Sequence, residues 1–147
     1  MSNGLNDYAG NPEMRVGLRE PFPPKLVSKL DKGSHSEDYV NHAAVTDRLN
    51  AEAPGWTMSK PEWIWAGPEG TGRHIAGVLC SMTIGSVTRW EVGDVDRATN
   101  PGDEAKKAIS DFIKRAAMRF GVAIDMWSKE DLLADEDNER VSTAVET

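Results

Sequence analysis

The sequence predicts an α+β fold: a helix, an antiparallel β-meander of about three strands, and a long second helix packed on the sheet. Three observations predict it. Residues 102–121 repeat apolar side chains at helical spacing, residues 57–94 contain three extended segments between turn residues, and residues 36–52 carry an approximate apolar stripe. A chain of 147 residues can bury one modest core, so we expect one core domain, residues 34–129, between a flexible arm and an acidic tail.

The N-terminal arm is expected to comprise residues 1–33. It begins with polar, glycine-containing sequence, and the run Pro-Phe-Pro-Pro at residues 21–24 breaks any helix there. A short apolar segment, residues 26–30, follows the prolines. We therefore predict a mobile arm with one docking patch.

The first helix of the core is predicted over residues 36–52. Ser34 and Glu37 have the spacing of a capping box, and Pro54 and Gly55 end the pattern. The apolar stripe of this helix consists of Tyr39, Val40, Ala43, Ala44, Thr46 and Leu49.

Three strands are predicted next, over residues 57–66, 73–84 and 87–94. Turn residues occupy 67–72, and Gly85 with Ser86 forms a two-residue connection typical of a tight hairpin, so the sheet order should be 1-2-3. One face of the second strand carries Ala76, Val78, Cys80, Met82 and Ile84. In the third strand, Trp90 and Val92 face one way and Arg89 and Glu91 the other.

The long helix has clear signals at both ends. Asn100 can cap it, with Pro101 at the first helical position and Asp103 and Glu104 in the first turn. Gly121 can end it in a left-handed turn.

The two long faces of this helix differ in chemistry. At about 100° per residue, one arc collects the apolar side chains of Ile109, Phe112, Ile113, Ala116, Ala117 and Phe120. Lys107, Lys114 and Arg115 gather on the opposite side, and Arg119 lies at the border. One face therefore suits a core and the other an anion.

This helix also carries a family resemblance. The run KKAISDFIKRAAMRFG at residues 106–121, followed by Asp-Met-Trp at 125–127, resembles the signature helix of the single-strand annealing proteins. That group, the Rad fifty-two superfamily, includes the eukaryotic mediator Rad fifty-two and many phage proteins. Residues 39–49, with Gly-Trp at 55–56, are similar to the first helix of the family and the turn after it, so the resemblance spans about residues 37–129.

The resemblance implies a phage-type recombinase that binds single-stranded DNA and anneals complementary strands in DNA recombination and repair. Such a protein is not an enzyme and needs neither ATP nor another cofactor, because the duplex itself supplies the driving energy. It must grip phosphates while base edges point outward, which requires a track of Lys and Arg. A homo-oligomeric ring would make that track continuous and multiply weak sites.

By resemblance, Lys114 and Arg115 face the single strand in an inner groove. Lys107 and Arg119 on the same helix, and Arg73, Arg89 and Lys60 in the strand region, are further DNA-binding candidates. The alternative is a solvated face in which Asp111 pairs with Arg115 at the i, i+4 spacing. The chain departs from the family where a basic residue usually begins the first helix, because it has His42 and Ala43 there.

The net charge of −7 is unevenly distributed. Residues 130–147 carry seven acidic residues and Arg140, which leaves a net charge of −1 for residues 1–129. An acidic end without aromatic residues is typically a disordered, solubilising tail. The alternative is that it competes with DNA for the groove or contacts a partner, such as a single-stranded DNA-binding protein.

Other classes of protein are disfavoured. No apolar run approaches the ~20 residues that cross a bilayer, and the polar start lacks a secretory signal, so we expect no membrane contact and a cytoplasmic protein, in the host cytoplasm if a phage encodes it. The lone Cys80 lies in an apolar run and is expected to be buried. His35, His42 and His74 lack a ligand pattern, so no metal is expected, and residues 67–72 lack the Lys-Ser/Thr of a phosphate loop.

Two alternatives to an annealing protein remain open. The first is an accessory module that binds single-stranded nucleic acid without pairing it, and the second is a small metal-dependent nuclease with an unrecognised site. The tryptophans do not decide between these classes, because large aromatic side chains fill cores and subunit interfaces as well as stacking on bases. They are Trp56, Trp63, Trp65, Trp90 and Trp127.

Overall fold

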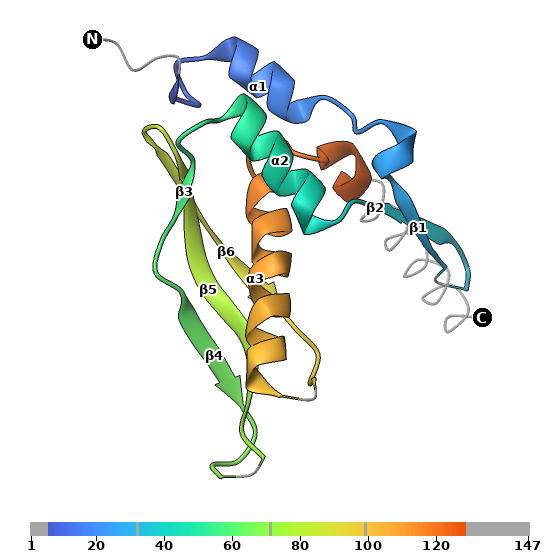
Figure 1. Ribbon diagram of the computed structural model, residues 1–147, viewed down its shortest axis with the longest axis vertical. Coiled ribbons are helices and arrows are strands. Elements are labelled where there is room, and N and C mark those ends of the chain that lie inside the picture. The colour runs from blue at the N-terminus through green and yellow to red at the C-terminus, as the bar shows by residue number, and fades with distance from the viewer. Residues whose placement is uncertain (1–5, 32, 71, 99, 129–147) are drawn as a thin grey trace, which may run out of the picture.

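The computed structural model describes residues 6–31, 33–70, 72–98 and 100–128. The elements in chain order are α1 (Pro12–Arg19), a 3₁₀ turn (Pro24–Leu26), β1 (Ser28–Asp31), β2 (Ser36–Tyr39), α2 (His42–Glu52), β3 (Thr57–Met58), β4 (Glu62–Ala66), β5 (His74–Ile84), β6 (Val87–Asp94) and α3 (Pro101–Met118). Helix α3 lies along the sheet formed by β3 to β6, and the hairpin of β1 and β2 projects away from that sheet (Figure 1). The predicted α+β class is confirmed.

Strand β5 is the centre of the four-stranded sheet. It pairs antiparallel with β6 along one edge, and with β3 and β4 one after the other along the other edge. The predicted meander is therefore confirmed, with its first strand split at residues 59–61. Pro61 has no backbone N–H to donate, which accounts for a break at this point.

The core lies between β5 and α3. Val78, Cys80, Met82 and Ile84 of β5 are buried, as their alternation predicts, and Phe112 of α3 is fully buried. The other buried side chains of α3 are Glu104, Ala108, Ala116 and Ala117. The apolar arc of the helix therefore faces the sheet, and its cationic side faces away.

Strand β6 approaches α3 closely at Gly93. A Cβ atom on Gly93 would lie 2.2 Å from the carbonyl oxygen of Ala108 and 2.6 Å from the backbone nitrogen of Phe112. A glycine is therefore required for the strand and the helix to pack at this distance.

Both ends of α3 agree with the sequence prediction. The Asn100 side chain accepts a hydrogen bond from the backbone N–H of Asp103 at 2.9 Å, with Pro101 next in the chain. Gly121 has a φ of +102°, in the left-handed region.

The start of the first core helix was predicted wrongly. Residues 36–39 form strand β2, and α2 begins only at His42, where the Asn41 side chain accepts from the N–H of Ala44 at 2.9 Å. Ser34, the expected cap, has its hydroxyl 3.0 Å from the His35 ring nitrogen instead. A cap at Asn41, seven residues after Ser34, leaves residues 36–39 free to pair with β1 as a hairpin.

The segment predicted as an arm contains helix α1. Its side chains Met14 and Leu18 are buried, as is Phe22 just after it, and these residues dock the segment on the core together with Val27 of the predicted patch at 26–30. Leu26 and Leu30 of that patch are exposed. The predicted acidic tail, residues 130–147, lies outside the described residues.

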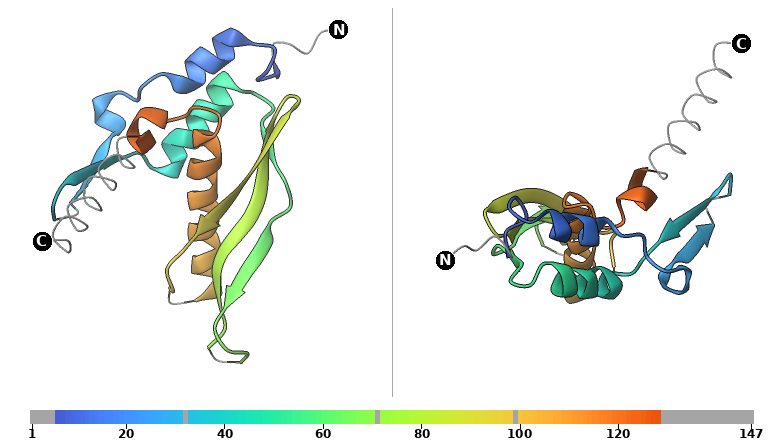
Figure 2. Two further views of the ribbon diagram at one scale, coloured as in Figure 1. Left: turned by 180° about the vertical axis from the view of Figure 1, so that it is seen from behind. Right: turned by 90° about the horizontal axis from the view of Figure 1, so that it is seen from above.

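The start of the described chain is tied to the turn between β5 and β6. The Asp7 carboxylate accepts from the backbone N–H of Ser86 at 3.1 Å and from its hydroxyl at 2.9 Å. The Tyr8 ring packs edge-on against Phe120 just after α3. Figure 2 shows this segment crossing the end of the sheet, on the other side of the molecule from the β1–β2 hairpin.

Candidate nucleic-acid interface

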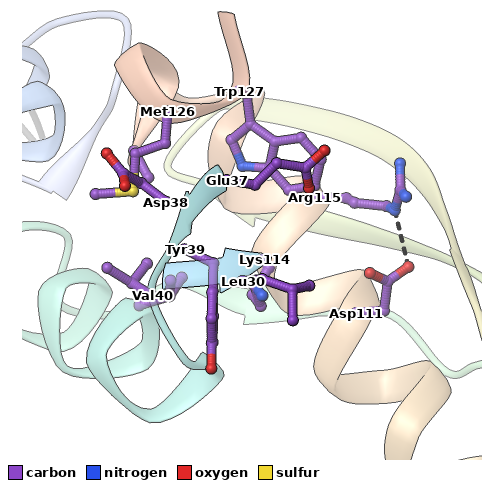
Figure 3. Close-up of a pocket in the computed structure, with 12 residues that line it drawn as sticks. Leu30, Glu37, Asp38, Tyr39, Val40, Asp111, Lys114, Arg115, Met126 and Trp127 are labelled. Atoms are coloured by element: carbon purple, nitrogen blue, oxygen red, sulfur yellow. Dashed lines mark hydrogen bonds and ion pairs between the residues drawn. The ribbon is translucent and has the colours of Figure 1, made fainter. Parts of the chain in front are cut away.

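The cationic side of α3 forms one wall of a pocket of about 410 Å³. The β1–β2 hairpin forms a second wall, and the short helical segment at 124–128 closes one end (Figure 3). The lining residues are Leu30, Glu37, Asp38, Tyr39, Val40, Val45, Asp111, Lys114, Arg115, Ala123, Met126 and Trp127.

A second, more open pocket of about 420 Å³ continues from the first towards the N-terminus of α3. The two share Tyr39, Asp111 and Lys114. The second is lined in addition by Asn41, His42, Lys106, Lys107 and Ser110. We call the two pockets together the basic groove, because Lys106, Lys107, Lys114 and Arg115 all line it.

Lys114 and Arg115, the two cations expected by resemblance to face the single strand, each lie against an aromatic ring. Lys114 Nζ lies 5.6 Å from the centroid of Tyr39, and Arg115 Cζ lies 5.2 Å from that of Trp127. Cation–π contacts of this kind hold a charge in place without neutralising it. Tyr39 is 40% exposed, so a flat face remains open beside the lysine.

Arg115 also makes the ion pair anticipated as the alternative reading. Its Nε donates to Asp111 Oδ2 at 2.8 Å, one turn earlier on α3 (Figure 3). Burial disfavours the charged guanidinium, but the hydrogen bond from Arg115 to Asp111 and the charges of Asp111, Asp94 and Glu91 outweigh burial and raise the pKa of Arg115. The side chain is 37% exposed, so it can still meet a ligand.

Two further carboxylates from β6 lie beside this pair. The backbone N–H of Asp94 donates to Asp111 Oδ2 at 2.9 Å, and a hydrogen bond between the two side chains raises the pKa of Asp94, with burial and the charge of Asp111 adding to it. Glu91 accepts from Arg119 Nε at 2.8 Å. Burial opposes ionisation of Glu91, but this bond and a backbone N–H outweigh it and lower its pKa.

Of the seven predicted DNA-binding residues, the structure brings Lys107, Lys114 and Arg115 together in the basic groove. Lys107 also lies 3.8 Å from Asp103, at the i, i+4 spacing. The remaining four do not line the groove.

Those four residues lie on other surfaces. Arg119 pairs with Glu91. Arg89 donates to the carbonyl of Arg119 and packs over the rings of Tyr8 and Phe120, so its side chain joins the end of α3 to the N-terminal segment. Arg73 lies over the Trp65 ring at 5.0 Å, and Lys60 is exposed between β3 and β4.

Tyr39 and Lys106 line the groove but were not predicted from the sequence to do so. It assigned Tyr39 to a helix stripe, whereas the residue ends strand β2, just before the Asn41 cap. The Asn at 41 was the available signal, since it marks a helix start after Tyr39. Lys106 precedes Lys107 on the solvent side of α3 and lines the groove with it.

No family model matches the chain. Among curated proteins, it is similar to the single-stranded DNA-binding protein DdrA of Deinococcus radiodurans, with 28% identity over 135 residues. The match covers 87% of this chain and 61% of DdrA, so the chain spans about three fifths of the length of that relative.

The described ranges show neither a candidate metal site nor a candidate membrane-spanning helix. They contain no group of three or more His, Cys, Asp or Glu side chains placed to hold a metal ion. Within the same part of the chain, no helix has both the length and the apolar character required to cross a membrane.

Proposed function

We propose that this protein binds single-stranded DNA along the basic groove and anneals complementary strands as an oligomeric ring, without ATP. It would then act in DNA recombination and repair as a phage-type member of the Rad fifty-two superfamily. The observation that carries the proposal is the groove itself, in which four cations follow one helix face beside two aromatic rings. The similarity to a single-stranded DNA-binding protein supports the same class of ligand.

The geometry of the groove suits a single strand. Lys106, Lys107 and Lys114 offer point charges to successive phosphates, and the open face of Tyr39 offers a stacking surface to a base. Stacking on an aromatic face tolerates any base, so the groove would bind with little sequence preference. Annealing needs such a site, since base edges must stay available to the second strand.

Assembly accounts for how a nearly neutral body holds a polyanion. Four cations per protomer, two of which form ion pairs with carboxylates, give a weak site, but repeated sites on one strand raise the effective concentration of each next contact. The outer face of the sheet offers a surface for self-association, because Trp90 is 58% exposed and Val92 is 41% exposed. A ring built from such contacts would align the grooves.

The direct test replaces Lys114 and Arg115 with Ala. Each phosphate contact on a single strand contributes about 0.7 to the slope of log affinity against log salt, so the double variant should lose about 1.4 from that slope and bind more weakly. Annealing of complementary oligonucleotides, followed by fluorescence, should be abolished.

The matched control removes two cations outside the groove. Lys25 and Arg97 are exposed and line neither pocket, so Lys25→Ala with Arg97→Ala should leave binding and annealing close to those of the wild type. Equal binding by the groove variant and the wild type would overturn the site assignment.

The second candidate function is an accessory module that protects single strands without pairing them. It is favoured by the similarity to DdrA, which is a single-stranded DNA-binding protein. Binding with no acceleration of annealing by the wild type would establish this candidate in place of the first.

A further inference from the structure

Within the basic groove, the carboxylate of Asp111 occupies the guanidinium of Arg115. Asp111 Oδ2 accepts two hydrogen bonds, from Arg115 Nε at 2.8 Å and from the backbone N–H of Asp94 at 2.9 Å. Asp111 is thus fixed at both sides, by the helix cation and by the end of β6. The carboxylate lines both pockets of the groove, in the place where a phosphate would approach Arg115.

A phosphate and Asp111 compete for the same guanidinium. Arg115 is held over the Trp127 ring, which restricts where its planar fork can turn. Its Nε edge already faces Asp111, so a phosphate that approaches this edge meets a carboxylate of the same charge sign. Binding must therefore displace the carboxylate or neutralise it.

Neutralisation can come from the second carboxyl group. The side chains of Asp94 and Asp111 are hydrogen-bonded to each other, which favours a proton on Asp94 and raises its pKa. A proton shared by two neighbouring carboxyl groups lowers the negative charge that faces Arg115. The guanidinium is then freer to pair with a phosphate.

We propose that Asp111, positioned by Asp94, restrains Arg115 and makes the affinity of the groove for single-stranded DNA depend on protonation of this carboxyl pair. The inference rests on the proposed function and adds a residue that opposes binding within the same site. Asp111 and Asp94 are positioning residues here, since they act through Arg115.

Several other charged groups face the pair, and they set the background against which it titrates. They are Glu37 and Asp38 from β2, His42 from α2, Glu91 from β6, Lys106, Lys107 and Lys114 from α3, and Arg119 just after α3. Because several of these groups are themselves titratable, the test compares variants at each pH rather than relying on one profile.

The experiment measures the Kd for a fluorescent oligo-dT over pH 5 to 8 at constant ionic strength. Asp111→Asn keeps an oxygen for both hydrogen bonds and removes the charge, so it should bind about two- to fivefold tighter than the wild type at pH 7.5, the range of an exposed ion pair. Asp94→Asn should also bind more tightly, because its amide can donate to Asp111 as a protonated Asp94 does. The ratio of wild-type Kd to variant Kd should decrease for both variants as the pH is lowered, because the pKa of Asp94 is raised.

The exposed Asp96 lies outside both pockets, so Asp96→Asn is the matched control for a lost charge and should keep the wild-type pH profile. If the wild type binds and Asp111→Asn binds no more tightly, or keeps a constant ratio to the wild type at all pH values, this inference fails and the proposed function stands. If the wild type does not bind oligo-dT at all, both fail. Should Asp111→Asn not fold, as judged by circular dichroism, the Asp94→Asn profile decides alone.

Discussion

Glu104 is a buried acid whose task is structural. Only 1% of the residue is exposed, and its two carboxylate oxygens accept from the backbone N–H of Ile75 at 3.1 Å and of Ala98 at 3.0 Å. The hydrogen bond from Ala98 is the main cause of its lowered pKa; burial opposes the shift, and the bond from Ile75 adds to the lowering. Glu104 thereby joins the start of α3 to β5 and to the loop after β6.

This lowered pKa predicts how stability depends on pH. A carboxyl group with a folded pKa below its unfolded value stabilises the fold above the unfolded pKa, and that stabilisation is lost as the pH falls through the folded value. In Glu104→Gln, one amide nitrogen would face an N–H donor, so thermal denaturation should show a lower Tm at pH 7 and a smaller loss below pH 4.5. Glu69→Gln, in the exposed loop after β4, should match the wild type at both pH values.

At the scale of single residues, the spacing of Glu104 indicates that it is buried, which was not predicted. Glu104 precedes Ala108 and Phe112 by four and eight positions, which places it on the buried stripe of the helix. Sequence analysis assigned it to a favourable first turn instead, because an acid at a helix N-terminus is common there. Only the packing of β5 against the helix reveals what its oxygens bind.

The contact between β6 and α3 is the clearest constraint at the scale of elements. Gly93 lies so close to Ala108 and Phe112 that any side chain would force strand and helix apart. Gly93→Ala should therefore lower the free energy of unfolding by about 1–3 kcal/mol, the usual cost of overpacking, as measured by urea denaturation.

The matched control is the same substitution within α3. A Cβ on Gly102 meets nothing closer than 3.3 Å, so Gly102→Ala should be neutral or stabilise by up to about 1 kcal/mol through reduced freedom of the unfolded chain. Similar losses at the two positions would contradict the close approach of β6 and α3.

The elements that the sequence predicts well are those whose signals are local. Helix α3 has both caps and an uninterrupted apolar period, and the β5–β6 hairpin has a two-residue turn, so each was predicted with nearly correct bounds. The β1–β2 hairpin was missed, because its strands are short and mostly exposed and show no apolar alternation. Helix α1 was not predicted, because its sequence is mostly polar and begins with a proline. Its buried side chains are Met14 and Leu18.

For the molecule as a whole, helix α3 separates the basic groove from the four-stranded sheet. Its apolar face packs on the inner side of the sheet, and its cationic face lines the basic groove. The outer side of the sheet carries exposed Trp90 and Val92. Self-association through the outer sheet face would therefore leave the groove uncovered.

This arrangement predicts that assembly and strand binding can be separated by mutation. Trp90→Thr with Val92→Thr removes the apolar surface and places residues with high strand propensity at both positions. The double variant should therefore show a lower oligomer mass in mass photometry and a Tm within a few degrees of the wild type. Thr88→Ser, on the same face, should assemble as the wild type does. An unchanged mass in the double variant would exclude this face as the subunit contact.

The site was predicted in part, for a physical reason. Helical spacing places Lys107, Lys114 and Arg115 on one face, and the structure has them there. Spacing within one helix says nothing about the wall opposite, which is why the hairpin and Tyr39 were not foreseen. Arg89 was misplaced for the same reason, because its partners Tyr8 and Phe120 come from distant parts of the chain.

The anchoring of Asp7 on Ser86 has a practical consequence for how the protein is labelled. An affinity tag or fluorophore placed ahead of residue 6 emerges beside the β5–β6 turn, on the far side of the molecule from the hairpin. One attached directly after residue 128 emerges next to Trp127, which lines the groove proposed to bind DNA. Oligonucleotide titrations should therefore use a label at the N-terminus, because it leaves the groove unobstructed and does not alter the measured Kd.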